Sequence, residues 1–389
     1  MNWLQSLLWK IFKYTYGFKI KLKYKVKKVS DTEIPERPFI LIANYSHFMD
    51  PYFISVTEPY PIVYLLNTPT VKAHKQKLPY ILETIPEYTK NKKQYFPVVA
   101  KMLNKLREKK IIGLLPEETR SWDGETQDLK LKTVKFLKRL NKAIRIARIK
   151  GSYLTQPRWA ETRRKGKIRI STYNISKEEL ETMDERELKD KLDEYLHQND
   201  IKDEELQQIK FKGQNLASGI QYILWLCPNC NAEDSIYGKE NTVYCKNCDE
   251  NWEIDGNLRI ISKNSPYKDL KDWADWQKEN IKNRIKTSDD DKIICSSKNV
   301  ELLYTAGTEF DYDYYSNGDL NLYKDKLVFK PYDKNREVIE FLIEKIMNYK
   351  DYDNVSFEFN YLAEYFKVKS SGKNASKWTF FWKEIQSKS

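Results

Sequence analysis

The sequence predicts an α/β protein, in which a mostly parallel sheet flanked by helices is followed by a small cysteine-rich domain and a C-terminal α+β module. Between residues 39 and 172, short apolar runs alternate with longer segments of helical periodicity. This pattern is typical of a parallel sheet covered on both faces. Two Cys-x-x-Cys pairs mark the cysteine-rich domain, and strand-like patterns dominate after residue 291. A length of 389 residues fits two or three domains.

The chain is basic and rich in aromatic residues. Its formal net charge is +12, and 14% of its residues are aromatic. This composition favours an anionic partner, which is either nucleic acid or an anionic membrane surface.

The N-terminal segment favours the membrane. Residues 1–18 combine tryptophans and leucines with Lys10 and Lys13, and six more lysines follow between Lys19 and Lys28. The apolar stretch is too short for a transmembrane span, and it lacks the small-residue cleavage site of a secretory signal. The pattern is typical of a helix in the interface of an anionic bilayer. The alternative is an amphipathic helix packed on the chain's own core.

Residues 18–26 follow a different pattern, in which apolar residues and lysines alternate strictly. Alternation with a period of two predicts a half-buried strand, the first of the sheet.

Two of the predicted strands end in polar residues. The apolar run 39–43 leads into Asn44–Pro51, and the run 111–115 leads into residues 116–125. Both are buried-strand patterns, and open α/β sheets place their active sites at such strand ends.

The polar residues at these ends suit one kind of chemistry. His47 and Asp50 are three residues apart, so on a helix they share a face and the carboxylate can fix the tautomer of the imidazole. Arg120, with a hydroxyl and a carboxylate beside it, suits a phosphate that carries hydroxyl groups. We therefore predict proton abstraction from an alcohol that carries a phosphate.

Further elements complete this domain. Strands are predicted at 62–66, 144–149 and 167–172, and helices at 96–109, at 129–140 and, as a pair, at 176–209. Ser176 is the expected cap of the first helix of that pair.

In these residues the chain resembles the glycerophospholipid acyltransferases, the family of 1-acyl-sn-glycerol-3-phosphate (lysophosphatidate) acyltransferases. The family's first block reads Asn-His-x-Ser-x-x-Asp-Pro, and the counterpart here is Asn44-Tyr45-Ser46-His47-Phe48-Met49-Asp50-Pro51. The third block reads Phe-Pro-Glu-Gly-Thr-Arg-Ser, and the counterpart is Leu115-Pro116-Glu117-Glu118-Thr119-Arg120-Ser121. Residues 147–153 resemble the fourth block, where a strand returns to the site. The resemblance covers about residues 30–175.

The chain also departs from the family pattern. Tyr45 stands at the position of the family's catalytic histidine, and Glu118 replaces a glycine whose backbone freedom it lacks. The segment nearest to the second block is Ile85–Lys90, with Lys90 in place of the family's arginine.

The resemblance implies acyl transfer from a thioester donor, coenzyme A or acyl carrier protein, to a lysophosphatidate-like glycerophospholipid. His47 would be the base that takes the proton of the acceptor hydroxyl, and Asp50 would hold its ring. The substrate-binding residues would be Asn44, Lys90, Glu117, Thr119 and Arg120. No catalytic cofactor is implied. The expected location is cytoplasmic, peripheral on the inner face of the cell membrane.

The tyrosine at the histidine position keeps a second hypothesis open. In it, the chain is a catalytically impaired family member that acts as a lipid-binding or scaffolding protein.

The cysteines form a separate signal. Cys227 and Cys230 make one Cys-x-x-Cys pair, Cys245 and Cys248 make another, and 14 residues lie between the pairs. Four thiolates in two such knuckles match a structural zinc site of the ribbon type. Two disulfides or a redox dithiol are the alternatives, but a lysine-rich chain without a secretion signal indicates a reducing compartment. A ribbon also raises the question of nucleic acid; residues 231–257, however, hold more acidic than basic side chains, so no specific nucleic acid is expected.

The remaining residues predict a polar helix and then a β-rich module. The helix is predicted at 262–285, strands at 292–296, 300–304, 319–323, 327–330 and 355–361, and helices at 338–349 and 376–385. Asn317-Gly318 predicts a hairpin turn. Strands followed by a terminal helix resemble the pleckstrin-homology-like class of small barrels, which is the class we expect here.

These observations give five predicted parts. They are residues 1–29 (membrane-interface helix and first strand), 30–212 (acyltransferase-like domain), 213–262 (zinc ribbon), 263–290 (linker helix) and 291–389 (C-terminal module).

Overall fold

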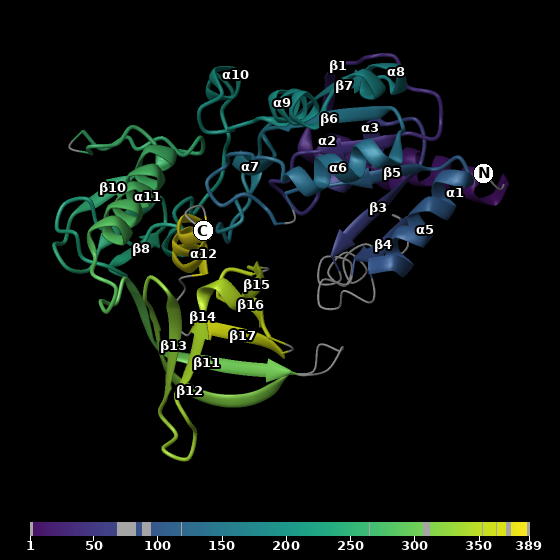
Figure 1. Cartoon of the computed structure of the whole chain (residues 1–389). Coiled ribbons are helices and arrows are strands. Elements are labelled where there is room, and N and C mark those ends of the chain that lie inside the picture. The colour runs from purple at the N-terminus through teal and green to yellow at the C-terminus, as the bar shows by residue number, and fades with distance from the viewer. Residues whose placement is uncertain are drawn as a thin grey trace. The chain divides into compact units, whose positions relative to one another are not determined.

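The computed structural model describes residues 3–67, 83–87, 95–117, 119–263, 265–305, 312–351, 353–362, 364–370 and 375–386. The chain divides into two compact units (Figure 1). The first contains residues 1–158 and 162–214, and the second contains residues 159–161 and 215–389.

The first unit is built on a seven-stranded sheet with the order β1-β7-β6-β2-β5-β3-β4. The strands are β1 (Lys27–Ser30), β2 (Ile40–Ala43), β3 (Ile62–Asn67), β4 (Glu83–Glu87), β5 (Ile111–Leu114), β6 (Ile144–Lys150) and β7 (Arg169–Ile175). Neighbouring strands run parallel except β6 and β7, which are antiparallel. The prediction of a mostly parallel sheet is therefore confirmed.

Helices cover both faces of this sheet, as predicted. One core contains residues of α1 (Trp3–Phe12), α2 (Phe18–Tyr24) and α3 (Asp50–Thr57). The opposite core contains residues of α5 (Tyr95–Arg107), α6 (Leu131–Leu140), α8 (Lys177–Thr182) and α9 (Glu185–Leu196).

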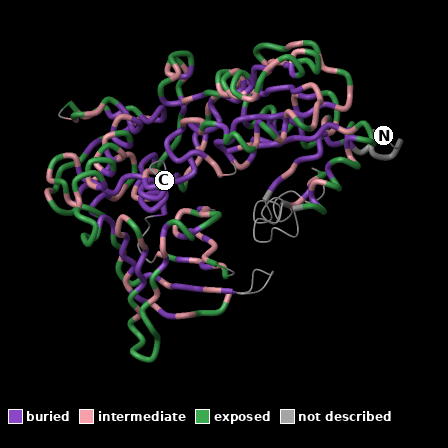
Figure 2. Tube along the Cα trace, in the orientation of Figure 1, coloured by how far each residue is buried: buried purple, intermediate pink, exposed green. Residues whose placement is uncertain are grey.

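The central strand β2 belongs to both cores. Leu41 lies in the first core, whereas Ile40 and Ile42 lie in the second, because successive side chains of a strand point to opposite faces. All of its residues are buried, and Figure 2 shows the strands of this sheet mostly in the colour of buried residues. An apolar run without alternation is what a parallel strand covered on both sides requires.

The N-terminal segment corrects one prediction, because residues 18–24 form a helix and the predicted strand at 18–26 is wrong. Helix α1 continues through a π-helical turn (Lys13–Gly17) into α2, and the sheet begins only at β1. Ile20 and Tyr24 are four residues apart and both buried, while Leu22 is 62% exposed. The alternating pattern contains an i, i+4 pair, and in a helix such a pair shares a face. Among the described residues, no helix is long and apolar enough to cross a bilayer.

The predicted helix pair at 176–209 is present as α8 and α9, followed by the short α10 (Glu204–Gln207). The hydroxyl of Ser176 accepts the N–H of Glu179 at 3.1 Å, so this residue caps α8 as expected.

The second unit begins with a small antiparallel sheet of strand order β10-β9-β8. Its strands are β8 (Ile236–Lys239), β9 (Thr242–Cys245) and β10 (Asn251–Glu253), and α11 (Leu270–Thr287) follows. Trp252 packs edge-on against Trp273 of α11, with ring centroids 4.8 Å apart. Residues of the predicted ribbon and the predicted polar helix thus share one small core.

A second seven-stranded sheet, antiparallel throughout, completes this unit with the order β14-β13-β12-β11-β17-β16-β15. The strands are β11 (Cys295–Thr305), β12 (Asp313–Leu322), β13 (Lys326–Pro331), β14 (Ile339–Leu342), β15 (Ile346–Lys350), β16 (Ser356–Tyr361) and β17 (Glu364–Ser370). The closing helix α12 (Ala375–Gln386) is present as predicted. The pleckstrin-homology-like class stays a prediction.

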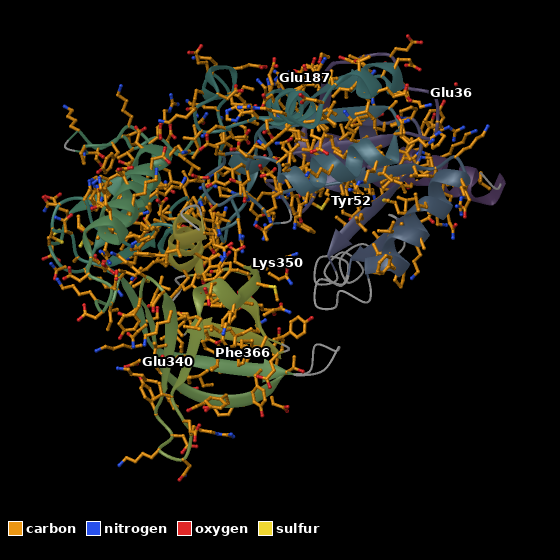
Figure 3. The ribbon with its side chains drawn as sticks, in the orientation of Figure 1. Glu36, Tyr52, Glu187, Glu340, Lys350 and Phe366 are labelled. Carbon is orange, nitrogen blue, oxygen red and sulfur yellow. The ribbon has the colours of Figure 1, made fainter. Side chains whose placement is uncertain are left out.

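Two predictions in this module are wrong. Residues 338–349 form β14, a 3-10 turn and β15 instead of a helix. Phe341 of β14 packs edge-on against Phe359 and Phe366 (labelled in Figure 3), at ring-centroid distances of 5.1 and 4.8 Å. These aromatic contacts hold the segment in the sheet. Asn317-Gly318 lies inside β12 rather than in a turn. A Cβ atom at Gly318 would approach the Lys330 carbonyl oxygen to 2.3 Å, so this glycine permits close strand pairing.

Candidate functional site

The loops that follow β2, β5 and β6 meet at one edge of the first sheet. These three strands are parallel neighbours with β2 in the middle, so their carboxyl ends lie side by side. The N–H of Tyr45, in the loop after β2, donates to Glu117 Oε1, in the loop after β5, at 2.5 Å. The N–H of Ser121 donates back to the Tyr45 carbonyl oxygen at 3.2 Å. The first and third motif segments are therefore in direct contact.

Asn44 connects the first motif segment to β6. Its side-chain amide donates to the Ile149 carbonyl oxygen at 2.9 Å and accepts the Ile149 N–H at 2.7 Å. The residue is buried. These bonds hold the ends of β2 and β6 together, and a substrate-binding role for Asn44 stays a prediction.

His47 lies in the core of the domain and is only 1% exposed. Its ring stacks on Phe53 with centroids 5.6 Å apart, and it meets Tyr24 edge-on at 6.2 Å. Its Nδ1 accepts the N–H of Met49 at 3.0 Å. In a neutral imidazole one nitrogen accepts and the other carries the proton, so this bond places the proton of neutral His47 on Nε2.

Asp50 binds the backbone and not the imidazole. Its Oδ2 accepts the N–H groups of Ser46 and His47, at 2.8 and 2.7 Å. The predicted contact between the Asp50 carboxylate and the His47 ring is therefore wrong. The reason is that α3 begins at Asp50, so His47 precedes the helix and the two residues do not share a helical face.

A second buried carboxylate, which the sequence analysis did not identify, lies near Asp50. Asp200 accepts the N–H of Tyr153 at 2.9 Å, and its charge contributes to raising the pKa of Asp50. Burial is the main cause that raises the pKa of Asp50 to about 7 and that of Asp200 to about 6. Asp200 lies between α9 and α10, inside the segment 176–209 for which the sequence predicted only a pair of helices.

The third motif segment is held mainly by its backbone and by Glu117. The second carboxylate oxygen of Glu117 accepts the N–H of Gln127 at 3.0 Å. Thr119 and Arg120 are half-buried, and the Arg120 carbonyl oxygen accepts from Arg158 at 3.4 Å. The guanidinium of Arg158 lies 4.0 Å from the centre of the Trp122 ring. The predicted residue Lys90 lies outside the described residues.

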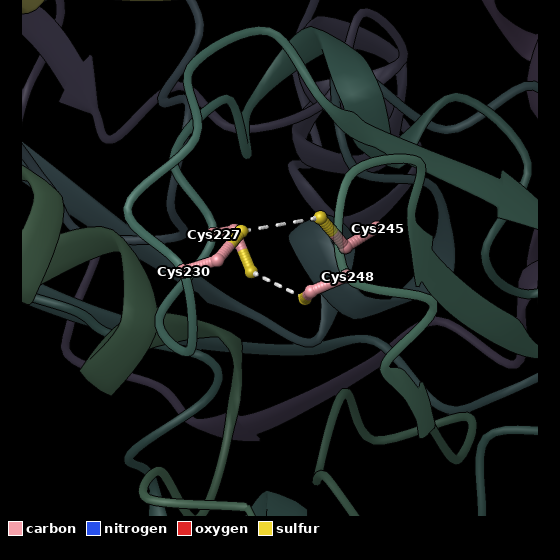
Figure 4. Close-up of side chains that lie close together, drawn as sticks. All are labelled: Cys227, Cys230, Cys245 and Cys248. Carbon is pink, nitrogen blue, oxygen red and sulfur yellow. Dashed lines mark hydrogen bonds between the residues drawn. The ribbon is translucent and has the colours of Figure 1, made fainter.

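The four cysteines of the ribbon come together in the second unit (Figure 4). Their sulfur atoms all lie within 4.8 Å of one another. The Cys227–Cys248 and Cys230–Cys245 sulfur pairs are 3.7 and 3.8 Å apart, and all five cysteines of the chain are free thiols. A tetrahedral zinc ion with Zn–S bonds of about 2.3 Å places its sulfurs roughly 3.8 Å apart, whereas a disulfide requires about 2.05 Å. The group can therefore hold a metal ion.

The thiols differ in their electrostatics. The N–H of Ala232 lowers the pKa of Cys230 to about 6, whereas burial raises that of Cys227 to about 12. A metal ion bound by all four sulfurs would displace the remaining protons, because thiolates are the ligands. The N–H of Asn247 donates to Cys245 Sγ at 3.3 Å and supports that sulfur as an anion.

No family model matches the chain, and no curated protein matches it. Among solved structures, the chain is similar to the 1-acyl-sn-glycerophosphate (LPA) acyltransferase PlsC from Thermotoga maritima, with 18% sequence identity and a TM-score of 0.38. This similarity covers 48% of the present chain and 76% of the PlsC chain.

Proposed function

We propose that the chain is an acyltransferase that moves a fatty acyl group from a thioester donor to a lysophosphatidate-like glycerophospholipid at a membrane surface. One observation carries the proposal. The segments that resemble the first, third and fourth family blocks follow adjacent parallel strands and are joined by hydrogen bonds, including that from Tyr45 N–H to Glu117.

The reaction would proceed by attack of the acceptor hydroxyl on the thioester carbonyl. The hydroxyl loses its proton to a base, its oxygen forms the new ester bond, and the carbon–sulfur bond breaks to release the carrier thiolate, which takes up a proton. Arg120 and Thr119 would bind the phosphate of the acceptor. His47 would be the base, and it must first release the Met49 N–H, since Nδ1 is its unprotonated nitrogen.

The N-terminal helices support action at a membrane. Five large apolar side chains point to solvent at a helical spacing of four, three, four and four residues: Leu7, Ile11, Tyr14, Phe18 and Leu22. Exposed lysines accompany them at 10, 19, 21, 23 and 25, and residues 3–30 contain no acidic side chain. An apolar stripe with lysines around it suits an anionic bilayer interface. The opposite face of the same helices is buried on the sheet, so packing on the chain's own core leaves the apolar stripe available for a bilayer.

The transfer proposal is tested with the full-length protein on anionic vesicles that contain a lysophosphatidate, supplied with labelled acyl-CoA or acyl carrier protein. We expect a diacyl phosphatidate product, a loss of roughly 10²–10⁴-fold in His47→Ala and retained activity in Tyr45→Phe. Arg120→Ala should also lower activity, because Arg120 would bind the phosphate of the acceptor. Its matched control is Arg139→Ala, a substitution of an exposed arginine in the last turn of α6. Loss in Tyr45→Phe with retention in His47→Ala would show that the base is not His47.

The second candidate function is lipid binding without turnover. A specific observation favours it, because the His47 ring is buried with Nδ1 bonded to the backbone, and the Asp50 carboxylate also binds backbone N–H groups. Vesicle binding that is weakened in Arg120→Ala but yields no product with either donor would select this candidate.

Membrane binding itself is tested by sedimentation with vesicles of mixed phosphatidylglycerol and phosphatidylcholine. The double variant Phe18→Ser/Leu22→Ser should bind vesicles more weakly than the wild type. The control is Val29→Ser, which replaces another exposed apolar residue near the same segment and should bind like the wild type. Equal binding of both variants would contradict a role of the stripe.

We also propose that the four cysteines hold a structural zinc ion, with no open position for chemistry. The sulfur spacing supports this assignment. Elemental analysis should find about one zinc per chain in the purified protein and none in Cys230→Ser combined with Cys248→Ser.

A further inference from the structure

The C-terminal helix α12 carries a lysine that is buried against the ribbon. Lys377 is 1% exposed. Its Nζ lies 2.7 Å from a carboxylate oxygen of Glu233 and 3.3 Å from one of Asp234. A charge at this depth depends on its counter-ions, because a buried ammonium without a partner is strongly unfavourable.

Both counter-ions belong to the loop that leaves the first cysteine knuckle. Glu233 lies three residues after Cys230. The backbone fixes this loop to the knuckle, since Cys227 N–H donates to the Ala232 carbonyl oxygen at 3.1 Å and Asp234 N–H donates to the Trp225 carbonyl oxygen at 2.7 Å. The position of the two carboxylates therefore depends on the geometry of the knuckle.

The segment before the knuckle is also fixed by α11. Gln277, which is fully buried, accepts the N–H groups of Trp225 and Leu226 at 2.8 and 3.0 Å. Arg284 of the same helix pairs with Glu233. None of these contacts involves Lys377, so its replacement removes no hydrogen bond or ion pair between α11 and the ribbon.

The other side of α12 packs on the β-rich module. Trp378 lies 5.6 Å from Phe357 and Trp382 lies 5.1 Å from Tyr349, measured between ring centroids. The Trp378 ring nitrogen also donates to Ser297 Oγ at 2.9 Å. One helix thus contacts the ribbon through Lys377 and the aromatic core of the β-rich module through its tryptophans.

We propose that a metal ion in the ribbon controls the docking of α12, because it fixes the loop that supplies the counter-ions of Lys377. Without the ion, four close thiol groups no longer hold the knuckles together, the loop loses its position and the Lys377 charge loses its partners. The helix then leaves its site and uncovers the aromatic core of the module. The inference rests on the zinc site proposed above.

Hydrogen exchange of the full-length protein, with and without a zinc chelator, tests this link. Chelation should raise exchange in residues 375–386 at least about tenfold, as expected when a docked helix opens locally. Lys377→Met keeps a long apolar side chain and needs no counter-ion, so its α12 should remain protected after chelation even though residues 227–248 lose protection. Lys383→Met, at an exposed position of the same helix, is the matched control and should respond like the wild type.

The outcomes separate the inference from the zinc site. Purified protein without zinc overturns both. If zinc is bound but chelation does not change hydrogen exchange in residues 375–386, the inference alone is overturned. It is also overturned if chelation raises this exchange equally in Lys377→Met and in the wild type. If Lys377→Met does not fold, Glu233→Gln combined with Asp234→Asn should raise exchange in α12 with zinc still bound, and unchanged exchange overturns the inference.

Discussion

Replacement of Asp50 by asparagine should stabilise the first unit more at pH 8 than at pH 5. The Oδ2 atom of Asp50 accepts two backbone N–H groups, and the amide oxygen of asparagine can accept the same two. Oδ1 is buried without a hydrogen-bond partner among the described residues. The substitution therefore keeps the contacts of the turn and removes a buried charge.

The magnitude follows from the pKa of Asp50. Burial raises this pKa from 3.8 to about 7, which corresponds to ~4 kcal/mol of cost for the ionised form, at 1.36 kcal/mol per pKa unit. The folded protein binds one more proton than the unfolded chain between these two pH values. Its stability therefore falls as the pH rises from about 4 to about 7, and the full cost is present above pH 7.

Urea unfolding of wild type and Asp50→Asn at pH 5 and pH 8 measures this difference. We expect the variant to be more stable by ~2–4 kcal/mol at pH 8, the upper figure being the full electrostatic cost, and by less than ~1.5 kcal/mol at pH 5. Asp50→Ala is the control, since it leaves the N–H groups of Ser46 and His47 without their acceptor and should destabilise at both pH values. A variant that loses stability at pH 8 would refute the assignment of an unfavourable buried charge.

Two further predictions concern buried ion pairs. Glu58→Gln removes the charge that lies 3.1 Å from the fully buried Arg145 and should cost ~3 kcal/mol in urea unfolding; a change below ~1 kcal/mol would show that other groups neutralise this arginine. Burial opposes ionisation of Glu233, but Lys377 and Arg284 hold the pKa of Glu233 below its usual value. The contribution of Glu233 to stability is therefore complete above pH ~4.5 and is lost as the pH falls through its lowered folded pKa. The thermal unfolding temperature of Glu233→Gln should therefore depend less on pH below ~4.5 than that of the wild type. Parallel pH profiles of the two proteins would contradict this.

The sequence predicted the central strands β2 and β5 well because they are uniformly apolar, whereas the edge strands β1 and β4, which contain charged residues, were not predicted. Residues 40–43 and 111–114 are buried on both sides, and no helical or surface pattern competes with such a run. The sites of the motif segments followed directly, since a strand that ends in polar residues fixes where they lie.

Local pattern was insufficient where one set of apolar spacings fits two structures. Ile20 and Tyr24 satisfy both a period of two and an i, i+4 repeat, and packing on the sheet selected the helix. Residues 338–349 show the opposite outcome, because the aromatic ring of Phe341 meets Phe359 and Phe366, which are distant in sequence. In both cases the deciding contact is tertiary, and intrinsic propensity is a weak guide there.

The same limit explains the misplaced pair in the candidate site. A spacing of three brings His47 and Asp50 together only if a helix already includes residue 47, and α3 begins at Asp50. The Asp50 carboxylate accepts the N–H groups of Ser46 and His47, so it is engaged with the turn that precedes the helix. Asp50 cannot orient the imidazole through the oxygen that makes these bonds. Catalysis by His47 would therefore require the loop to rearrange when a lipid binds, and the comparison of His47→Ala with Tyr45→Phe on vesicles tests that requirement directly.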